Sequence, residues 1–242
     1  MSTTRSDETR ATVPDPEIRV LSSVEELSLL PEFERSIWGA SDENVSFVVL
    51  VSCIDEGGVA LGAFDGEELV GSVFGFRTRD AEVMHSHYLA VAAAHRGRGL
   101  GERLKFAQAE WCLAEGITAM RWTFDPLQLV NAHLNLVKLG AVGERYRVDH
   151  YGPMGGINGG MASDRLTVRW ELDATERTRV AQRWTERCAV VVPVVSPEEI
   201  AAGSATARSA RMSLRDSMEP LLADGWRVVS VDLRDRRYEL AR

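Results

Sequence analysis

The sequence is poor in cysteine. Its 242 residues include only Cys53, Cys112 and Cys188, which lie far apart. An odd number at these spacings excludes a disulfide framework, offers no clear zinc-ligand pattern and fits a reducing compartment. We therefore expect a cytoplasmic protein without a bound metal.

Long apolar runs are also missing, so no segment predicts a membrane span. The first residues, MSTTRSDETRATVPDPE, are polar and acidic and lack the apolar centre of a secretory signal. The formal net charge of -8 disfavours nucleic acid as the main partner. Lysine is scarce as well: Lys105 and Lys138 are the only two, which leaves few targets for self-acetylation.

The most informative segment present is HRGRGLG, from His95 to Gly101. It follows an apolar run that ends at Val91 and precedes a long helical pattern, so it predicts a strand, a tight turn and a helix start. Glycines keep side chains away from a closely approaching ligand, the N–H groups of a helix start attract anions, and arginines match phosphate geometry. The expected phosphate or pyrophosphate site comprises Arg96, Gly97, Arg98, Gly99, Leu100 and Gly101.

Two common phosphate-binding motifs do not fit this segment. No Lys-Ser or Lys-Thr follows the glycines as in a P-loop, and Glu102 occupies the last glycine position of the dinucleotide pattern G-x-G-x-x-G. The pattern R-x-x-G-x-G fits, with Leu89-x-Val91 just upstream. In this context the segment resembles the coenzyme A turn of the GNAT superfamily of acyl-CoA N-acyltransferases. The resemblance implies acetyl-CoA as co-substrate, with Leu89 and Val91 as further binding residues beside the thioester.

The predicted elements agree with this resemblance. Hydrophobic patterns and turn signals predict the order β-α-α-β-β-β-α-β-α-β-β over residues 17–172, with the glycine turn after the fourth strand. One helix is expected from Ser22 or Ser23 to Trp38, and Asp65-Gly66 is expected to form a hairpin turn. The expected fold class is α+β: a GNAT fold with a mixed, mostly antiparallel sheet, flanking helices and a small α/β C-terminal extension.

Three regions are expected along the chain. We expect a disordered tail over residues 1–16 and the acyltransferase core over residues 17–172. Residues 173–242 are expected to form an extension that packs on the core or on a partner subunit. Within the extension we expect a strand over 189–195, mostly helix over 197–223 and a final hairpin whose edge could join two copies into a homodimer.

Short runs in the core resemble a branch of predicted GNAT acetyltransferases that carries a C-terminal extension; they include SHYLAV, WTFDPLQ and YGPM. In the extension, Arg208, Arg211 and Arg215 fall on one helical face. That face is either solvated and paired with nearby acids, or it clamps an acidic substrate or the coenzyme phosphates.

Acyl transfer to an amine requires a base, and the strand over 83–91 should carry it. Strict alternation places His85, His87, Leu89 and Val91 on one face, unless a bulge breaks the phase. Histidine suits base catalysis near neutral pH, and Glu82 could act through water if desolvation raised its pKa. We expect His87 to be the base, ahead of Glu82 and His85. Each histidine could instead be a hydrogen-bonded residue of the sheet, and a metal site on both lacks a third ligand.

The sequence departs from the family pattern at the position of the general acid. The resemblance implies a tyrosine four residues before the glycine of a K-x-G-F turn, but Leu136 stands there and Ala141 replaces the phenylalanine. Tyr151 is the expected alternative, with Tyr146 and Tyr88 as further donors. A thiolate is also a tolerable leaving group without an acid.

The family often uses an asparagine at the start of the following helix to bind the pantetheine arm. The usual position holds Leu129, so Asn131 is the candidate here, although it could simply cap the helix. Loops at the strand ends offer an acceptor pocket. Asp125 could equally form a turn, and Asp164 and Arg165 could form a structural ion pair. The expected acceptor-binding residues are Thr123, Asp125, Asp164 and Arg165.

Together these features predict direct transfer of an acetyl group from acetyl-CoA to the amine of a small-molecule acceptor in a ternary complex. The alternative is a regulatory or sensor module that binds an acyl-CoA without turnover.

Overall fold

The computed structural model describes residues 15–39, 45–153 and 159–242. Most of the tail expected over residues 1–16 therefore lies outside the described residues. The strands are β1 (Glu17–Val20), β2 (Val59–Asp65), β3 (Glu68–Arg77), β4 (Val83–Val91), β5 (Ala119–Phe124), β6 (Val142–Arg147), β7 (Arg165–Glu171), β8 (Arg187–Val191), β9 (Arg227–Asp232) and β10 (Arg237–Ala241). The α-helices are α1 (Val24–Leu27), α2 (Leu29–Trp38), α3 (Phe47–Asp55), α4 (Leu100–Ala114), α5 (Leu129–Ala132), α6 (Ala174–Ala181), α7 (Pro197–Ala201) and α8 (Ala205–Ala223). A 3-10 turn, η1 (Ala93–His95), precedes α4, and a π-helical segment, η2 (His133–Lys138), continues α5.

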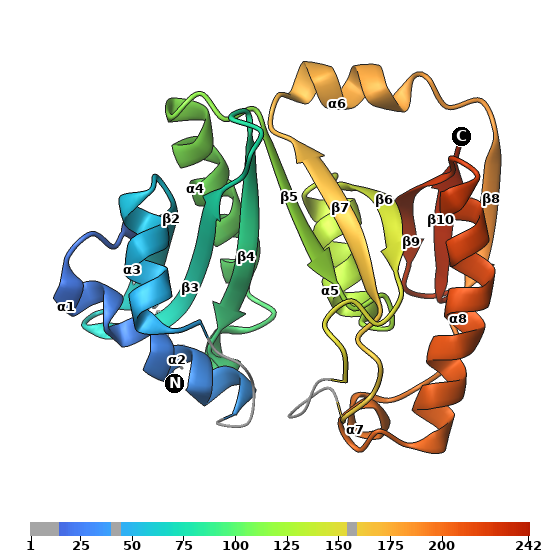
Figure 1. The fold of residues 1–242 in the computed structure, drawn as a ribbon, viewed down its shortest axis with the longest axis horizontal. Coiled ribbons are helices and arrows are strands. Elements are labelled where there is room, and N and C mark those ends of the chain that lie inside the picture. The colour runs from blue at the N-terminus through green and yellow to red at the C-terminus, as the bar shows by residue number, and fades with distance from the viewer. Residues whose placement is uncertain (1–14, 40–44, 154–158) are drawn as a thin grey trace, which may run out of the picture.

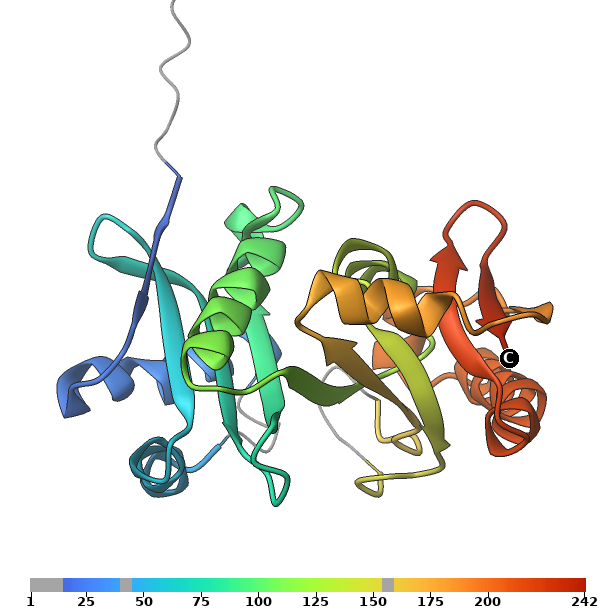
Figure 2. The same ribbon diagram turned by 90° about the horizontal axis from the view of Figure 1, so that it is seen from above.

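The described strands form one twisted sheet in the order β1-β2-β3-β4-β5-β7-β6-β9-β10-β8 (Figure 1). Only β4 and β5 run parallel; the other neighbouring pairs are antiparallel. The expected mixed, mostly antiparallel sheet is thus confirmed. Helices α2, α3 and α8 lie on one side of it, and α4 and α5 lie on the other (Figure 2).

The buried apolar residues form two clusters. The smaller cluster lies under α1 to α3 and includes Leu30, Leu50 and Phe74. The larger one packs α4 against the sheet and continues without interruption into the extension through β9, β10 and α8. Burial of apolar area on both faces holds the central strands rigidly in place.

The parallel pair β4–β5 is short. The two strands pair only at Val83–Ala119, Met84–Met120 and His85–Arg121, after which β5 continues beside β7 alone. Figure 1 shows β4 and β5 meeting at their upper ends and separating below. We call the His85–Arg121 pair the divergence point.

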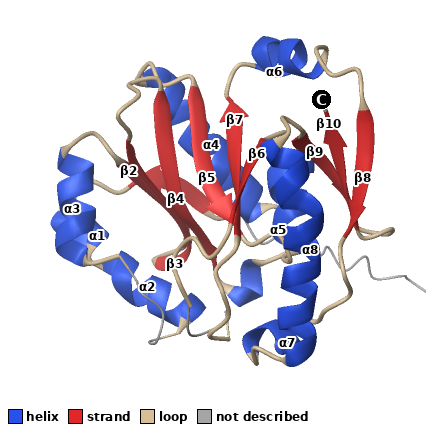
Figure 3. Ribbon diagram, turned by 45° about the vertical axis from the view of Figure 1, so that its right-hand side comes forward, coloured by secondary structure: helices blue, strands red, loops and turns tan. Residues whose placement is uncertain are grey.

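The extension completes the sheet rather than forming a separate body. β9 joins β6 at Gly143–Val228, and a Cβ on Gly143 would lie 2.8 Å from the Cβ of Val228. Only glycine permits this close approach of two strands. Helix α8 packs across β6, β8 and β9 (Figure 3).

Several boundaries differ from the sequence-based expectations. The helix expected up to Trp38 is divided: α1 begins with a capping box formed by Ser23 and Glu26, and α2 starts anew after Ser28. The β2–β3 turn uses Gly66 and Glu67, because Asp65 still pairs with Glu68.

Two further differences lie in the extension. β8 ends at Val191, short of the strand expected up to residue 195. Helix α6 was not expected, because it carries no apolar stripe and none of its residues is buried. Asp173 starts it by accepting the N–H groups of Thr175 and Glu176.

Candidate acyl-transfer site

The turn between β4 and α4 has the backbone of an anion site. Gly97 and Gly99 have φ angles of 72° and 81°, in the left-handed region, and Gly99 is the N-cap of α4. A Cβ at either position would meet nothing within 4 Å, so the turn opens to the surface. The glycines are therefore needed for backbone conformation and leave room for a ligand.

The N-terminus of α4 presents free donors beside this turn. The first helical hydrogen bond runs from the N–H of Arg103 to the carbonyl of Gly99, at 3.0 Å, so the N–H groups of Leu100 and Gly101 have no partner within the helix. The dipole of this 15-residue helix adds partial positive charge at that end. Arg96 and Arg98 are exposed here, and the Nε of Arg96 donates to the carbonyl of Val91 at 2.9 Å.

The end of β4 lies against the same turn. A Cβ on Gly101 would be 3.4 Å from Leu89 and 3.7 Å from Val91. The N–H of Ala92 donates to the carbonyl of Val70 on β3, and alternate residues of an antiparallel strand bond to opposite neighbours. The backbone groups of Leu89 and Val91 therefore point away from β3, toward the side on which β5 no longer pairs with β4. The structure thus brings all the turn residues expected to bind the coenzyme together with Leu89 and Val91.

A bulge at His87 corrects the predicted faces of β4. Tyr88 pairs with Phe74 and Ser86 with Gly75, so His87 has no residue opposite it on β3. Before the bulge, Ser86 faces α4 and donates to Gln108 at 2.7 Å. After it, Leu89 and Val91 face α4 instead.

His85 and His87 therefore lie on the opposite face from Leu89 and Val91, and Tyr88 lies on their side. The two rings are 6.0 Å apart and both contact Phe76, at 4.8 and 5.8 Å between centroids. Desolvation lowers the pKa of His87. Desolvation lowers the pKa of His85 to about 4, with further contributions from the charges of His87, Arg121, Lys105 and His150. Both imidazoles are thus neutral near pH 7, and the exposed His87 is the more accessible of the two.

Glu82 lies at the other end of β4 from the glycine turn. Its side chain is exposed, and its carbonyl accepts the N–H groups of Thr118 and Ala119, which starts β5. The structure does not bring Glu82 to the turn. The position of Glu82 instead indicates a structural role at the start of the parallel pairing between β4 and β5.

Lys105 is a residue of this site that the sequence did not single out. It is 3% exposed on α4 and points to the divergence point from the face opposite the histidines. Its Nζ donates to Ser86 at 2.8 Å and to Gln108 at 3.3 Å, and it lies 3.8 Å from the centre of the Trp122 ring. With only neutral partners, desolvation lowers its pKa to about 7. No motif marks it, because a lysine in a helix is usually exposed.

A chain of side-chain hydrogen bonds links β5 to α5 and η2. Trp122 Nε1 donates to Asn135 at 3.2 Å, and Asn135 in turn donates to Asn131 at 3.2 Å. Asn131 is exposed on α5, and Leu134 of η2 lies 3.9 Å from the Cβ position of Gly101. Asn131 therefore stands on an element that borders the glycine turn. Single π turns of this kind are frequent at functional sites.

Thr123 and Tyr151 meet on the same face as the histidines. Their hydroxyl groups are 3.1 Å apart, although Thr123 is on β5 and Tyr151 follows β6. The guanidinium of Arg165 lies 5.6 Å from the centre of the Tyr151 ring. Three of the expected catalytic and acceptor-binding residues are thus brought together.

The carboxylates of Asp125 and Asp164 have partners within the protein instead. Asp125 accepts from both terminal nitrogens of Arg211, at 3.1 and 2.8 Å. Asp164 is fully buried and accepts from Arg215 at 2.9 and 2.7 Å and from Tyr146 at 2.8 Å. Burial alone would raise the pKa of Asp164, but these hydrogen bonds hold it below its usual value.

The arginines of α8 therefore pair with nearby acids, as one of the two alternatives predicted, but Arg211 and Arg215 do so within the protein and not on a solvated face. Arg211 and Arg215 are the core-facing arginines, and Arg208 donates to the carbonyl of Gly203. The expected ion pair of Asp164 is made with Arg215, while Arg165 donates to the backbone carbonyl of Asp164. Neither aspartate has its carboxylate available to an acceptor.

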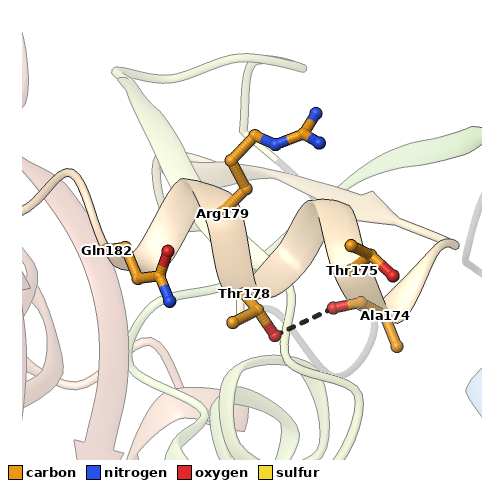
Figure 4. A pocket seen from close by; sticks show the side chains of 5 residues that line it. All are labelled: Ala174, Thr175, Thr178, Arg179 and Gln182. Carbon is orange, nitrogen blue, oxygen red and sulfur yellow. Dashed lines mark hydrogen bonds between the residues drawn. The ribbon is translucent and has the colours of Figure 1, made fainter.

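A surface hollow on α6 lies away from these groups. It is lined by Ala174, Thr175, Thr178, Arg179 and Gln182, and Figure 4 shows the Thr178 hydroxyl bonded to the carbonyl of Ala174. No titratable cluster or glycine turn adjoins it, so it offers no chemistry of its own. Among the described residues no group of acids, cysteines and histidines could hold a metal ion, and none of their helices is long and apolar enough to cross a bilayer.

The fold and the turn agree with a known family. Residues 24–139 match the family model of the acetyltransferase (GNAT) family. This chain carries a GNAT acetyltransferase domain. No match was found among curated protein sequences.

Solved structures show the same fold. The GNAT family acetyltransferase from Elizabethkingia anophelis, solved with acetyl-CoA bound, is 16% identical with a TM-score of 0.50, covering 65% of this chain and 98% of that one. The ribosomal-protein-S18-alanine N-acetyltransferase from Escherichia coli is 12% identical with a TM-score of 0.53, covering 65% and 94%. An aminoglycoside 6'-acetyltransferase type Ii is 16% identical with a TM-score of 0.50, covering 65% and 97%. The acceptors in these names differ, so the fold leaves the acceptor open.

Proposed function

We propose that this protein transfers an acetyl group from acetyl-CoA to the amine of a small-molecule acceptor in a ternary complex. The observation that carries the proposal is the joining of two features at one end of β4. The glycine turn offers free N–H groups and arginines for a pyrophosphate. The separation of β4 from β5 leaves the backbone of Leu89 and the N–H of Val91 without a strand partner, so that they can bind an extended amide-containing arm. Such an arm would run from the turn toward the divergence point, and Asn131 borders its path.

The chemistry follows from this placement. The acceptor nitrogen attacks the thioester carbonyl carbon, the carbon–sulfur bond breaks, and the coenzyme leaves as a thiolate. His87, neutral and exposed beside the divergence point, takes the proton from the amine. Free backbone N–H groups of β4 stabilise the oxyanion. Tyr151, held by Thr123 on β5, is the candidate that returns a proton to the thiolate.

The first experiment is native mass spectrometry with acetyl-CoA, followed by a mixed pool of amines. We expect a one-to-one acetyl-CoA complex that converts to bound CoA when an acceptor is present. A complex that forms but never turns over with any amine would favour a regulatory or sensor module. Absence of a complex would contradict the coenzyme site.

A matched pair of glycine variants tests the turn itself. Gly99→Ala and Gly66→Ala both place a Cβ in open space at left-handed backbone, with φ of 81° and 62°. Each should cost about 1 kcal/mol of stability through backbone strain. Only Gly99→Ala, which alters the anion-binding turn, should lower acetyl-CoA affinity, by about tenfold in calorimetry. Equal affinity in the two variants would remove the turn from the binding site.

A further inference from the structure

Lys105 connects β4 and β5 at the place where their pairing ends. Ser86 and Trp122 are the first residues of the two strands beyond the divergence point. The Nζ of Lys105 donates to the Ser86 hydroxyl at 2.8 Å and lies 3.8 Å from the centre of the Trp122 ring. One side chain from α4 therefore spans the separating strands on the side of the sheet that α4 covers.

The space around the Lys105 ammonium group is filled. Lys105 is 3% exposed, and Gln108 accepts from its Nζ at 3.3 Å and from the Ser86 hydroxyl at 2.7 Å. A Cβ on Gly75 of β3 would lie 2.8 Å from the Nε2 of Gln108. The cluster of Lys105, Ser86 and Gln108 thus leaves no room toward β3 and closes the α4 side of the divergence point.

The coenzyme arm is long enough to bring its thioester to this place. Gly101 of the glycine turn lies level with Leu89 and Val91, because its Cβ position is 3.4 and 3.7 Å from their side chains. The arm between the phosphate and the thioester sulfur has about the length of four extended residues. An arm that starts at the turn and follows β4 toward the divergence point therefore ends near Ser86 and His87, with the acyl group ahead of it.

An acyl group at this place has little room to become longer. Ahead of it β4 and β5 are paired, and Met84 and Met120 of the next pair are fully buried. On the α4 side it meets the Lys105 side chain over the Trp122 ring. The remaining direction is the face of the exposed His87, which the acceptor amine needs for its own approach.

We propose that Lys105 is a specificity-determining residue, which limits the donor to short acyl groups such as acetyl by closing the α4 side of the divergence point. The inference rests on the proposed function and adds to it the basis of donor selection. Two hydrogen bonds hold the end of the lysine side chain in one position, so the limit is set by a fixed group.

A series of acyl-CoA thioesters tests the inference without an acceptor. Acetyl-CoA, butanoyl-CoA and hexanoyl-CoA are titrated into the full-length protein by calorimetry. Where an acyl chain is buried in free space, each added methylene raises affinity about fourfold. We expect the opposite trend in the wild type, with hexanoyl-CoA bound about tenfold more weakly than acetyl-CoA, because a filled site resists overpacking.

Variants at position 105 separate the effect of volume from that of charge. Lys105→Ala removes about as many heavy atoms as hexanoyl adds to acetyl, so the ratio of hexanoyl-CoA to acetyl-CoA affinity should rise about tenfold or more. Lys105→Met removes the charge but keeps most of the volume, and it should leave this ratio within about threefold of the wild type.

Two further variants complete the series. Lys105→Leu is shorter than lysine and apolar, so it should raise the ratio in part, and it takes the place of Lys105→Ala if that variant does not fold. Lys138→Ala, at the exposed second lysine, is the control and should change neither affinity.

The inference is overturned if the wild type binds hexanoyl-CoA as tightly as acetyl-CoA, if no shortened side chain at position 105 raises the ratio, or if Lys105→Met raises it as much as Lys105→Ala. In each of these cases, binding of acetyl-CoA would still support the coenzyme site of the proposed function. If none of the three thioesters binds, the proposed function fails, and the inference fails with it.

Discussion

The pKa of the buried Lys105 side chain is far below that of an ordinary lysine. Desolvation on α4 leaves it with only neutral partners, Ser86, Gln108 and the Trp122 ring, and lowers its pKa to about 7. The unfolded chain keeps this proton up to the ordinary lysine pKa, which is well above 7. Between the two pKa values the unfolded state therefore binds more protons, and the free energy of unfolding rises with pH.

Lys105→Met should remove this rise. We expect the slope of the unfolding free energy between pH 7 and 10 to fall by up to about 1.4 kcal/mol per pH unit, measured by urea unfolding. Lys138→Met is the control, because Lys138 is the other lysine and is exposed. Identical slopes in both variants would mean that Lys105 is charged throughout.

At the scale of elements, the bulge in β4 and the π-helical segment η2 shape the site. A regular β4 would place His87 with Leu89, but the bulge sends the histidines to one face and keeps Leu89 and Val91 against α4. Likewise, η2 widens the helix after α5 and buries Asn135, which joins Trp122 to Asn131. Both devices place polar groups around the point where β4 and β5 separate.

Two asparagine variants separate structure from binding on this element. Asn135→Leu leaves the buried Trp122 N–H without its acceptor and should cost about 1–3 kcal/mol in thermal or urea unfolding. Asn131→Ala, at an exposed position, should leave stability nearly unchanged and lower acetyl-CoA affinity. If both variants affect only stability, Asn131 has no part in binding the coenzyme.

At the scale of the whole molecule, the extension is bound to the core at the ends of its strands. Arg211 holds Asp125, Arg215 holds Asp164, and the Tyr238 hydroxyl donates to the carbonyl of Pro126 at 2.7 Å. These contacts join α8 and β10 to the loops that follow β5 and precede β7. The extension thereby fixes the loops close to Thr123 and Arg165.

A double-mutant cycle tests this anchoring. The side chains of Arg211 and Asp125 are 4% and 8% exposed, so Arg211→Met leaves a buried carboxylate unpaired and should cost about 3–5 kcal/mol. Adding Asp125→Asn should recover part of the loss, because the uncompensated charge disappears. Arg208→Met, one turn earlier on α8 but exposed, should cost far less. Equal losses for the Arg208 and Arg211 variants would contradict an anchoring role.

The amino-acid sequence by itself determined the glycine turn and the order of the core elements. These features depend on local properties: glycine conformations, helix starts and hydrophobic periods that can be read within a few residues. The strand bounds Val83–Val91 are therefore as predicted, and α4 begins at Leu100, within the segment predicted to start a helix.

Only the tertiary structure decided the faces of β4, the burial of Lys105 and the partners of Asp125 and Asp164. A bulge depends on the partner strand, the pKa of a lysine depends on what covers it, and Arg211 lies 86 residues from Asp125 in the chain. Such contacts are set by packing between distant segments, which neither local propensity nor periodicity encodes.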